Sequence, residues 1–384
     1  MTIQVSKEKG LEERVRLLSA VKRVVVKVGS AMLTSNDGLN IPVMESLADD
    51  LCFLIQNGKE VILVSSGAVA AGRRSLNLGN RSLSMKEKQA AAAFGQSSLM
   101  RVYEDIFAKK NQKVAQVLLT HDDLANRDRY LNIRNTLFTM FDWGLLPIIN
   151  ENDTVSVKEL RFGDNDTLAA MSTNLIEADI FICLTDVEGL YTGNPSNDPS
   201  ASLVYTVAQV NKEIEAMAGH VCGALGCGGM RSKILAAKMV SARGGSSFIG
   251  YGRQPKILQQ LFSGDPVGTF FLPQEEKMHS RKHWIAYTLR PKGFIVLDDG
   301  ACRAVLSGGK SLLPSGIIET RGLFSIGDPV HCIDQNEEPV AAGLVNYSSE
   351  DITKIQGQHS SKIEKILGFV DSEEIIHRDN LVVL

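Results

Sequence analysis

The stretch Pro147-Ile148-Ile149-Asn150-Glu151-Asn152-Asp153 passes directly from apolar residues into amides and carboxylates, and Gly163-Asp164-Asn165-Asp166 follows a short loop later. The apolar run from Leu145 to Ile149 is typical of a buried strand whose carboxyl end opens into a loop. Ligands of open α/β sheets bind outside the carboxyl ends of the strands. Asn, Asp and Gly are also ordinary turn formers, so this stretch alone is equally consistent with a plain turn and with a binding site.

The length and composition of the chain predict a cytoplasmic enzyme with two domains. A chain of 384 residues exceeds a single ordinary domain, and 44% hydrophobic and 22% charged residues are usual for a globular enzyme. The net charge of −3 gives no general attraction to nucleic acid or to an anionic membrane. No apolar run is long enough to span a membrane, and residues 1–20 lack the apolar core of a signal peptide. The six cysteines include no CxxC pair, which predicts reduced thiols and neither disulfides nor a zinc site.

Strand-like and helix-like segments alternate through the amino-terminal two thirds of the chain. The predicted strands are 21–28, 61–64, 114–119, 145–149 and 180–184, and the predicted helices are 42–57, 86–109 (one helix, or two joined near Gly95), 131–143, 167–178 and 232–243. This alternation predicts an α/β fold, a three-layer sandwich with helices on both faces of a mainly parallel central sheet.

Four of the predicted strands end in small, polar or charged residues: Lys27-Val28-Gly29-Ser30, Ser65-Ser66-Gly67, Asn150 to Asp153, and Thr185-Asp186. Four such endings at one edge of a parallel sheet predict a polar crevice for a ligand. The glycines at 29 and 67 let backbone N–H groups approach that ligand, and a following helix N-terminus favours an anion. The pattern therefore points to a ligand that carries phosphate.

The P-loop fingerprint does not account for this phosphate site. Gly67 and Gly72 have its glycine spacing, but Arg73-Arg74 replaces the required Lys-Ser/Thr pair. A better candidate is the glycine-rich run from Gly226 to Lys233, because backbone donors and a lysine at a helix start can hold phosphates. A surface loop with a solvated lysine is the alternative interpretation. Lys27 is a second candidate, since an ammonium near the end of a buried strand is costly without a partner.

Taken in order, the motifs of the chain resemble those of the glutamate 5-kinases, which belong to the amino acid kinase family. The resemblance runs from about residue 21 to 370 and rests on the segments 26–30, 65–72, 150–153, 163–166, 184–191 and 228–233. It implies ATP-dependent phosphorylation of the γ-carboxylate of L-glutamate, the first step of proline biosynthesis, with feedback inhibition by proline. Two segments depart from the family pattern: Val28-Gly29-Ser30 replaces Leu-Gly-Thr, and the nucleotide loop has Cys227 and Ser232 at two Thr positions. Ser232 keeps the hydroxyl, whereas Cys227 removes one hydroxyl near the nucleotide.

The resemblance also assigns roles to single residues. It implies that Lys27 and Lys233 neutralise the transferring phosphoryl group and that Asp166 holds their ammonium groups in place. It assigns glutamate to Ser66, Asp153 and Asn165. It assigns ATP to Lys27, Thr185, Asp186, Cys227, Gly228, Gly229, Met230, Arg231, Ser232 and Lys233.

The expected cofactor is Mg²⁺, which would bridge the phosphates of ATP without dedicated protein ligands. The expected assembly is a homo-oligomer, either a dimer or a tetramer. The segment 119–130 is similar to the family loop that is implicated in oligomer contacts and proline feedback. On its residues alone, the segment is equally well described as a solvated charged loop.

The composition changes after Phe271. Residues 274–290 are polar enough for a linker, and β-like runs at 293–297, 317–318, 329–333 and 340–345 predict a small β-rich domain over 291–370. This domain resembles a PUA domain, a barrel module common in RNA-modifying enzymes. The remaining predicted boundaries are an N-terminal extension at 1–20, a catalytic domain at 21–273 and a tail at 371–384.

An RNA partner is not favoured, because residues 291–384 hold 8 Lys and Arg residues against 14 Asp and Glu residues. Two alternative functions stay open. The chain could be an amino acid kinase that acts on aspartate or N-acetylglutamate, or an RNA-directed protein whose α/β domain senses a nucleotide.

Overall fold

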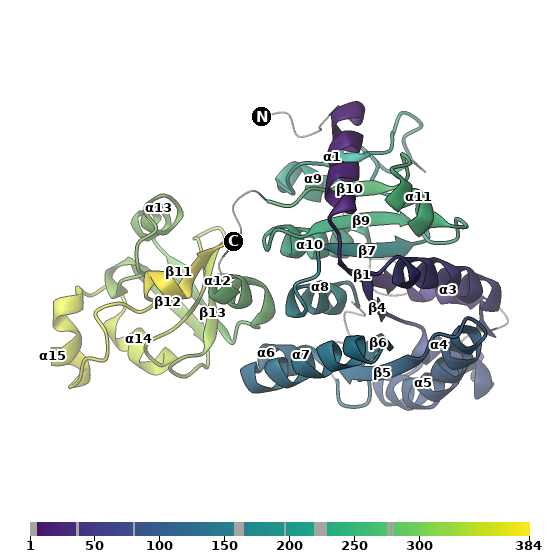
Figure 1. Cartoon of the computed structure of the whole chain (residues 1–384). Coiled ribbons are helices and arrows are strands. Elements are labelled where there is room, and N and C mark those ends of the chain that lie inside the picture. The colour runs from purple at the N-terminus through teal and green to yellow at the C-terminus, as the bar shows by residue number, and fades with distance from the viewer. Residues whose placement is uncertain are drawn as a thin grey trace. The chain divides into compact units, whose positions relative to one another are not determined.

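The computed structural model describes residues 6–35, 38–79, 81–156, 165–195, 197–218, 229–274, 278 and 280–384. The chain divides into two compact units, Met1–Lys277 (unit 1) and Met278–Leu384 (unit 2) (Figure 1). None of the helices in these described ranges is both long and apolar enough to cross a membrane.

Unit 1 is built on an 8-stranded sheet. Its order is β5 (Val114–Leu119), β6 (Leu146–Glu151), β4 (Glu60–Val64), β1 (Arg23–Val28), β7 (Ile180–Thr185), β9 (Ser246–Tyr251), β10 (Thr269–Phe271) and β8 (Thr206–Val207). β10 runs antiparallel to β9, whereas the other neighbours pair in parallel. The predicted mainly parallel sheet is therefore confirmed, and the four strands with polar endings, β6, β4, β1 and β7, are direct neighbours.

Helices cover both faces of this sheet (Figure 1). On one face α3 (Ile41–Gln56) packs with α5 (Met85–Ala108) and α11 (Ile257–Ser263) over an apolar core that includes Val24 and Val26. On the other face α8 (Asn165–Leu175) packs with α10 (Met230–Ser241) and lies over β1 and β7. Because successive side chains of a strand point to opposite faces, Lys27 lies on the α8 side of β1.

The remaining helices of unit 1 are short or lie at the edges of the sheet. They are α1 (Lys7–Ser19), α2 (Ser30–Leu33), α4 (Ala68–Ser75), α6 (His121–Ala125), α7 (Arg127–Asp142) and α9 (Lys212–Met217), with a small hairpin of β2 (Thr34–Ser35) and β3 (Gly38–Leu39). The segment 119–130 thus covers the end of β5, all of α6 and the start of α7.

Two glycines explain how α4 crosses α5. A Cβ atom on Gly95 would lie 1.9 Å from the carbonyl oxygen of Ala68, and one on Gly72 would lie 1.8 Å from that of Ala91. The two helices therefore meet backbone to backbone, and α5 is one continuous helix through Gly95. The P-loop-like spacing of Gly67 and Gly72 is accounted for by this crossing and by the left-handed φ of +96° at Gly67.

The first helix is joined to the far end of unit 1 by a buried arginine. The Arg14 guanidinium donates to the carbonyl oxygens of Asp265 (3.0 Å), Val267 (2.8 Å) and Tyr205 (2.9 Å). Its side chain is fully buried and lies over the ring of Phe270. Residues 7–19, predicted as part of an extension, are thus packed into unit 1.

Unit 2 is a β-rich module, as predicted. Its 5-stranded sheet has the order β12 (Ile317–Gly322), β11 (Gly293–Leu297), β13 (Pro329–Ile333), β14 (Pro339–Leu344) and β15 (Leu381–Val383). The helices are α12 (Ser280–His283), a π-helical turn (Trp284–Thr288), α13 (Asp299–Gly308), α14 (Ser349–Ile355) and α15 (Ile363–Leu367).

Two segments of unit 2 differ from the prediction. Residues 280–288 are helical where a linker was expected, because Ile285 packs against β14 and β15 through Ala342 and Val382. Leu381–Val383 pairs with β14 where a tail was expected.

Candidate functional site

A buried carboxylate lies between two lysines at the centre of unit 1. Asp166, in the first turn of α8, has Oδ1 at 2.5 Å from Lys27 Nζ and Oδ2 at 3.2 Å from Lys233 Nζ. The Asp166 side chain is 1% exposed, and the lysine side chains are 8% and 7% exposed. Burial opposes the charge of Asp166, but the two ammonium groups outweigh it and hold the pKa of the carboxyl below its ordinary value. The carboxylate therefore remains ionised and joins β1, α8 and α10.

Two further side chains hold the Asp166 carboxylate. Ser232 Oγ donates to Oδ2 at 2.7 Å, and Cys183 Sγ donates to Oδ1 at 3.6 Å. Cys183 is the register partner of Lys27 in the β1–β7 ladder, so both residues reach the same carboxylate from adjacent strands. Burial and the Asp166 charge raise the pKa of Cys183 to about 12, which keeps it a thiol. Two ammonium groups and one carboxylate leave this cluster with a formal charge of +1, which suits an anion.

Asn165 joins the ends of β4 and β6 beside the charged cluster. Its Nδ2 donates to Ser65 O at 2.7 Å, Ser66 Oγ at 3.0 Å and Asn150 Oδ1 at 3.1 Å. An amide nitrogen has two hydrogens, so three acceptors compete for two donors. Asn165 can consequently exchange one of these contacts for an oxygen of a ligand.

Two side chains on one face of α5 form hydrogen bonds with residues at the ends of β4 and β6. Gln96 Oε1 accepts from Asn150 Nδ2 at 2.8 Å, and the Tyr103 hydroxyl is hydrogen-bonded to Ser65 Oγ at 2.8 Å. Gln96 and Tyr103 are buried and lie seven positions apart, which places them on the same side of the helix. Sequence reasoning did not single out either residue. The available signal was two polar groups at helical spacing on the otherwise apolar side of α5.

Asp153 lies in the loop that follows β6. Burial, and to a smaller extent the nearby Glu151 carboxylate, raise the pKa of Asp153 to about 7. Ser156 Oγ donates to Glu151 Oε1 at 2.7 Å, which holds that carboxylate in place. A carboxyl with such a pKa is readily ionised by a cationic ligand, so Asp153 is a candidate partner for an ammonium group.

The candidate nucleotide residues at the end of β7 and the start of α10 lie across β1 from the ends of β4 and β6. Thr185 Oγ donates to Asp186 Oδ1 at 3.0 Å at the end of β7, and Gly229 is the residue before α10. In the strand order β6-β4-β1-β7, the residues assigned to glutamate follow β6 and β4, and Thr185 ends β7. Lys27 on β1 therefore stands between the two groups. Of the residues assigned to ATP, Cys227 and Gly228 lie outside the described residues.

The described residues contain no group of three or more His, Cys, Asp and Glu side chains placed to hold a metal ion. Asp166, the carboxylate nearest the lysines, already has both oxygens on cationic or hydroxyl donors.

Comparisons with known proteins show what the chain is similar to. Residues 22–249 match the model of the amino acid kinase family, and residues 293–367 match the PUA domain. The chain is 55% identical over 375 residues to a protein of Desulfotalea psychrophila named glutamate 5-kinase, a match that covers 97% of this chain and 100% of that protein. Proteins of the same name from Syntrophus aciditrophicus (49% over 373 residues; 97% of each chain) and Geobacter sulfurreducens (50% over 369 residues; 96% of this chain and 99% of that protein) are similar over nearly their whole length.

Proposed function

The chain belongs to the amino acid kinase family, and from this premise we propose that it transfers the terminal phosphoryl group of ATP to the γ-carboxylate of L-glutamate. The product would be L-glutamyl 5-phosphate, the first intermediate on the route to proline. The observation that carries the proposal is the buried Asp166 carboxylate between Lys27 and Lys233, with an amide-lined region on one side and Thr185-Asp186 on the other.

The two lysines would stabilise the charge of the phosphoryl group during transfer. Phosphoryl transfer depends mainly on positioning the reactants and neutralising the charge that spreads over the equatorial oxygens. Asp166 would act as the positioning residue for both ammonium groups. Its lowered pKa keeps it from holding a proton, and no general base is required because a carboxylate acceptor is already ionised near neutral pH.

The region at the carboxyl ends of β4 and β6 would hold glutamate. An ionised Asp153 would pair with the α-ammonium group, and Ser66 and Asn165 would donate to carboxylate oxygens. Three protein acceptors surround the two hydrogens of Asn165 Nδ2. A substrate oxygen can therefore replace one of these acceptors without leaving a hydrogen unpaired.

The nucleotide would lie against the end of β7 and the start of α10. The N-terminus of α10, which is 12 residues long, carries a partial positive charge that favours phosphate. Magnesium would arrive bound to the phosphates of ATP and neutralise part of their charge. The residues present fit a cation of this kind, since Mg²⁺ keeps most of its water and needs few protein ligands.

The substrate can be tested by comparing three acceptors. A coupled assay of ADP release with L-glutamate, L-aspartate and N-acetyl-L-glutamate should show the highest kcat/KM for L-glutamate. Hydroxylamine, which traps acyl phosphates as hydroxamates, should yield product only when the acceptor is turned over, which separates transfer from ATP hydrolysis. A higher kcat/KM for aspartate or N-acetylglutamate would replace the proposed substrate with that acceptor.

The lysine role can be tested on α10 itself. Lys233→Ala should lower kcat by about 10²–10³-fold, the usual effect of removing one group that stabilises transition-state charge. Lys238→Ala is the matched control, because Lys238 lies on the same helix and pairs with Glu215 at 3.1 Å. Equal losses in the two folded variants would contradict the role of Lys233.

The proposal extends to regulation, assembly and location. L-Proline carries an α-carboxylate and a secondary α-ammonium group, which can occupy the positions of the α-carboxylate and primary α-ammonium group of glutamate. Inhibition by proline should therefore be competitive with glutamate and should weaken in Asp153→Asn. A homo-oligomer, dimer or tetramer, is expected in light scattering after size-exclusion chromatography. Reduced thiols support a cytoplasmic location: Cys52, Cys183, Cys302 and Cys332, the described cysteines, are all free.

A further inference from the structure

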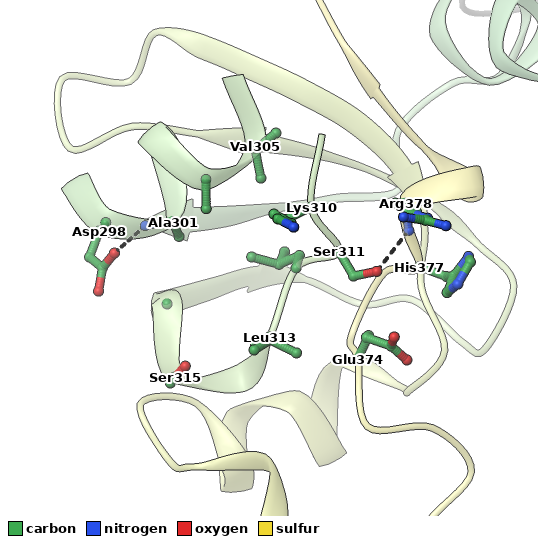
Figure 2. A pocket seen from close by; sticks show the side chains of 14 residues that line it. Asp298, Ala301, Val305, Lys310, Ser311, Leu313, Ser315, Glu374, His377 and Arg378 are labelled. Atoms are coloured by element: carbon green, nitrogen blue, oxygen red, sulfur yellow. Dashed lines mark hydrogen bonds between the residues drawn. The ribbon is translucent and has the colours of Figure 1, made fainter. Parts of the chain in front are cut away.

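Unit 2 contains a cavity of about 740 Å³ that has no part in the candidate site of unit 1. Three segments line it and leave it open on one side: the α13 side that carries Ala301, residues 310–316, and residues 374–378 (Figure 2). The last two segments are joined by the pairing of Leu312 with Ile376 and by the Arg378 N–H, which donates to Ser311 Oγ at 3.0 Å. The cavity is therefore part of the hydrogen-bonded framework of the unit.

The wall of this cavity is mainly apolar. Its apolar members come from α13 and the following segment: Ala301, Ala304, Val305, Leu312 and Leu313. The alanines are small, which leaves a hollow beside the helix, and Leu313 is 42% exposed. A volume of this size suits a small organic molecule whose body is apolar.

Two basic and two acidic side chains of described residues line the cavity, and they are not paired with one another. Lys310 and Arg378 line it, and neither makes an ion pair within the described part of the chain. The two carboxylates of the lining are already engaged: Asp298 accepts from Ala301 N at 2.7 Å, and Glu374 accepts from Ser372 Oγ at 2.8 Å. Figure 2 shows Asp298 at one end of the cavity, and Glu374 on the same side as Arg378 at the other. Because Arg378 makes no ion pair with Glu374, its guanidinium can receive a single anionic group there.

We propose that this cavity binds a small amphipathic anion: a single carboxylate or phosphate on an apolar body. The planar guanidinium of Arg378 can donate two parallel hydrogen bonds to such a group, Lys310 adds a second positive charge, and Ser311 Oγ has its own hydrogen to donate. The apolar body packs against α13. An extended polyanion fits poorly, because residues 278–384 hold 11 Lys and Arg residues against 14 Asp and Glu residues.

The test uses 2-naphthoate and its uncharged analogue 2-naphthamide as probes, titrated into the full chain by calorimetry. Naphthoate should bind saturably with one site in unit 2, and naphthamide at least about tenfold more weakly, because it lacks the charge-assisted hydrogen bonds. Equal affinities for the two probes would overturn the proposal.

Variants locate the probe. The double variant Lys310→Met, Arg378→Gln should lose at least about tenfold in naphthoate affinity with an unchanged unfolding temperature, because both side chains are exposed. The control Lys365→Met removes an exposed lysine of unit 2 that does not line the cavity, and its affinity should equal that of the parent. An unaffected double variant would overturn the proposal.

Competition separates this cavity from the candidate site. Saturating ATP and L-glutamate should leave naphthoate binding unchanged, whereas displacement by them would place the probe in unit 1 and overturn the proposal. Displacement by a short single-stranded RNA, with an affinity that falls steeply with salt, would assign the cavity to a polyanion and overturn it as well.

Discussion

Removing one hydroxyl from α5 should weaken glutamate binding without touching the lysine cluster. Tyr103→Phe keeps the fully buried ring and deletes the oxygen that lies 2.8 Å from Ser65 Oγ. Ser65 Oγ then keeps only the carbonyl oxygen of Ser66, at 3.3 Å. A neutral buried hydrogen bond contributes about 1 kcal/mol. If all of this free energy is lost from the binding of glutamate at the turn that carries Ser66, the KM for glutamate rises about fivefold.

The assay is initial-rate kinetics with glutamate varied at saturating ATP, together with thermal unfolding of each variant. In Tyr103→Phe, kcat should stay within about twofold of the parent, because Lys27 and Lys233 do not contact this hydroxyl. Tyr347→Phe is the matched control, since it deletes an equally buried hydroxyl that accepts from Asp371 N and Ser372 N in unit 2. The control should lose stability with an unchanged KM.

One result would refute the reasoning. If Tyr103→Phe lowers the unfolding temperature as much as the control does and leaves the KM for glutamate unchanged, the hydroxyl is merely structural. A rise in the KM for ATP equal to that for glutamate would show a general disturbance of the sheet edge and would refute the specific link between α5 and the acceptor region.

Four further outcomes are expected. The KM for glutamate should fall as pH rises from about 6 to 8, because Asp153, whose pKa is raised to about 7 by burial and by Glu151, must ionise to pair with an ammonium group; kinetics of Asp153→Asn should lack this pH dependence. The same raised pKa means that the folded state holds this proton more tightly than the unfolded state. Urea unfolding should therefore show a contribution to stability that is full below about pH 4 and is lost as pH rises through 7. Asp166→Asn leaves two buried ammonium groups without their carboxylate and should cost about 3–5 kcal/mol in urea unfolding, partly restored by ATP; an unchanged stability would contradict the buried ion cluster. Gly95→Ala places a Cβ 1.9 Å from a carbonyl of α4 and should yield little folded protein, whereas Ala93→Ser on the exposed side of α5 should fold normally, as judged by circular dichroism.

The strands around the candidate site could be predicted because each carries a local signal. The apolar residues of β1, β4, β6 and β7 end abruptly in polar residues, and that contrast is visible within a few positions of the chain. The polar support from α5 could not be predicted, because Gln96 meets Asn150 across 54 residues and Tyr103 meets Ser65 across 38. A glutamine and a tyrosine inside a helix have no local feature that reveals which loop they will reach.

The short elements of unit 2 could not be predicted from the sequence for a related reason. β15 has three residues, and it forms a strand because β14 offers it an unpaired edge. α13 was not predicted, although its ten residues have an amphipathic pattern. In unit 1, Gly95 was predicted only as a possible break between two helices, whereas it allows α4 to approach α5 closely.

The attachment of α1 through Arg14 has a consequence for the order in which the chain folds during synthesis. α1 leaves the ribosome well before its three carbonyl partners, which lie 191, 251 and 253 residues later in the chain. At the usual pace of translation this delay is roughly ten to fifty seconds. A helix of 13 residues is marginal on its own, so it must wait hydrated and largely unformed until the last strands of unit 1 emerge. α1 therefore cannot reach its native position until the segment that carries Asp265 and Val267 has emerged.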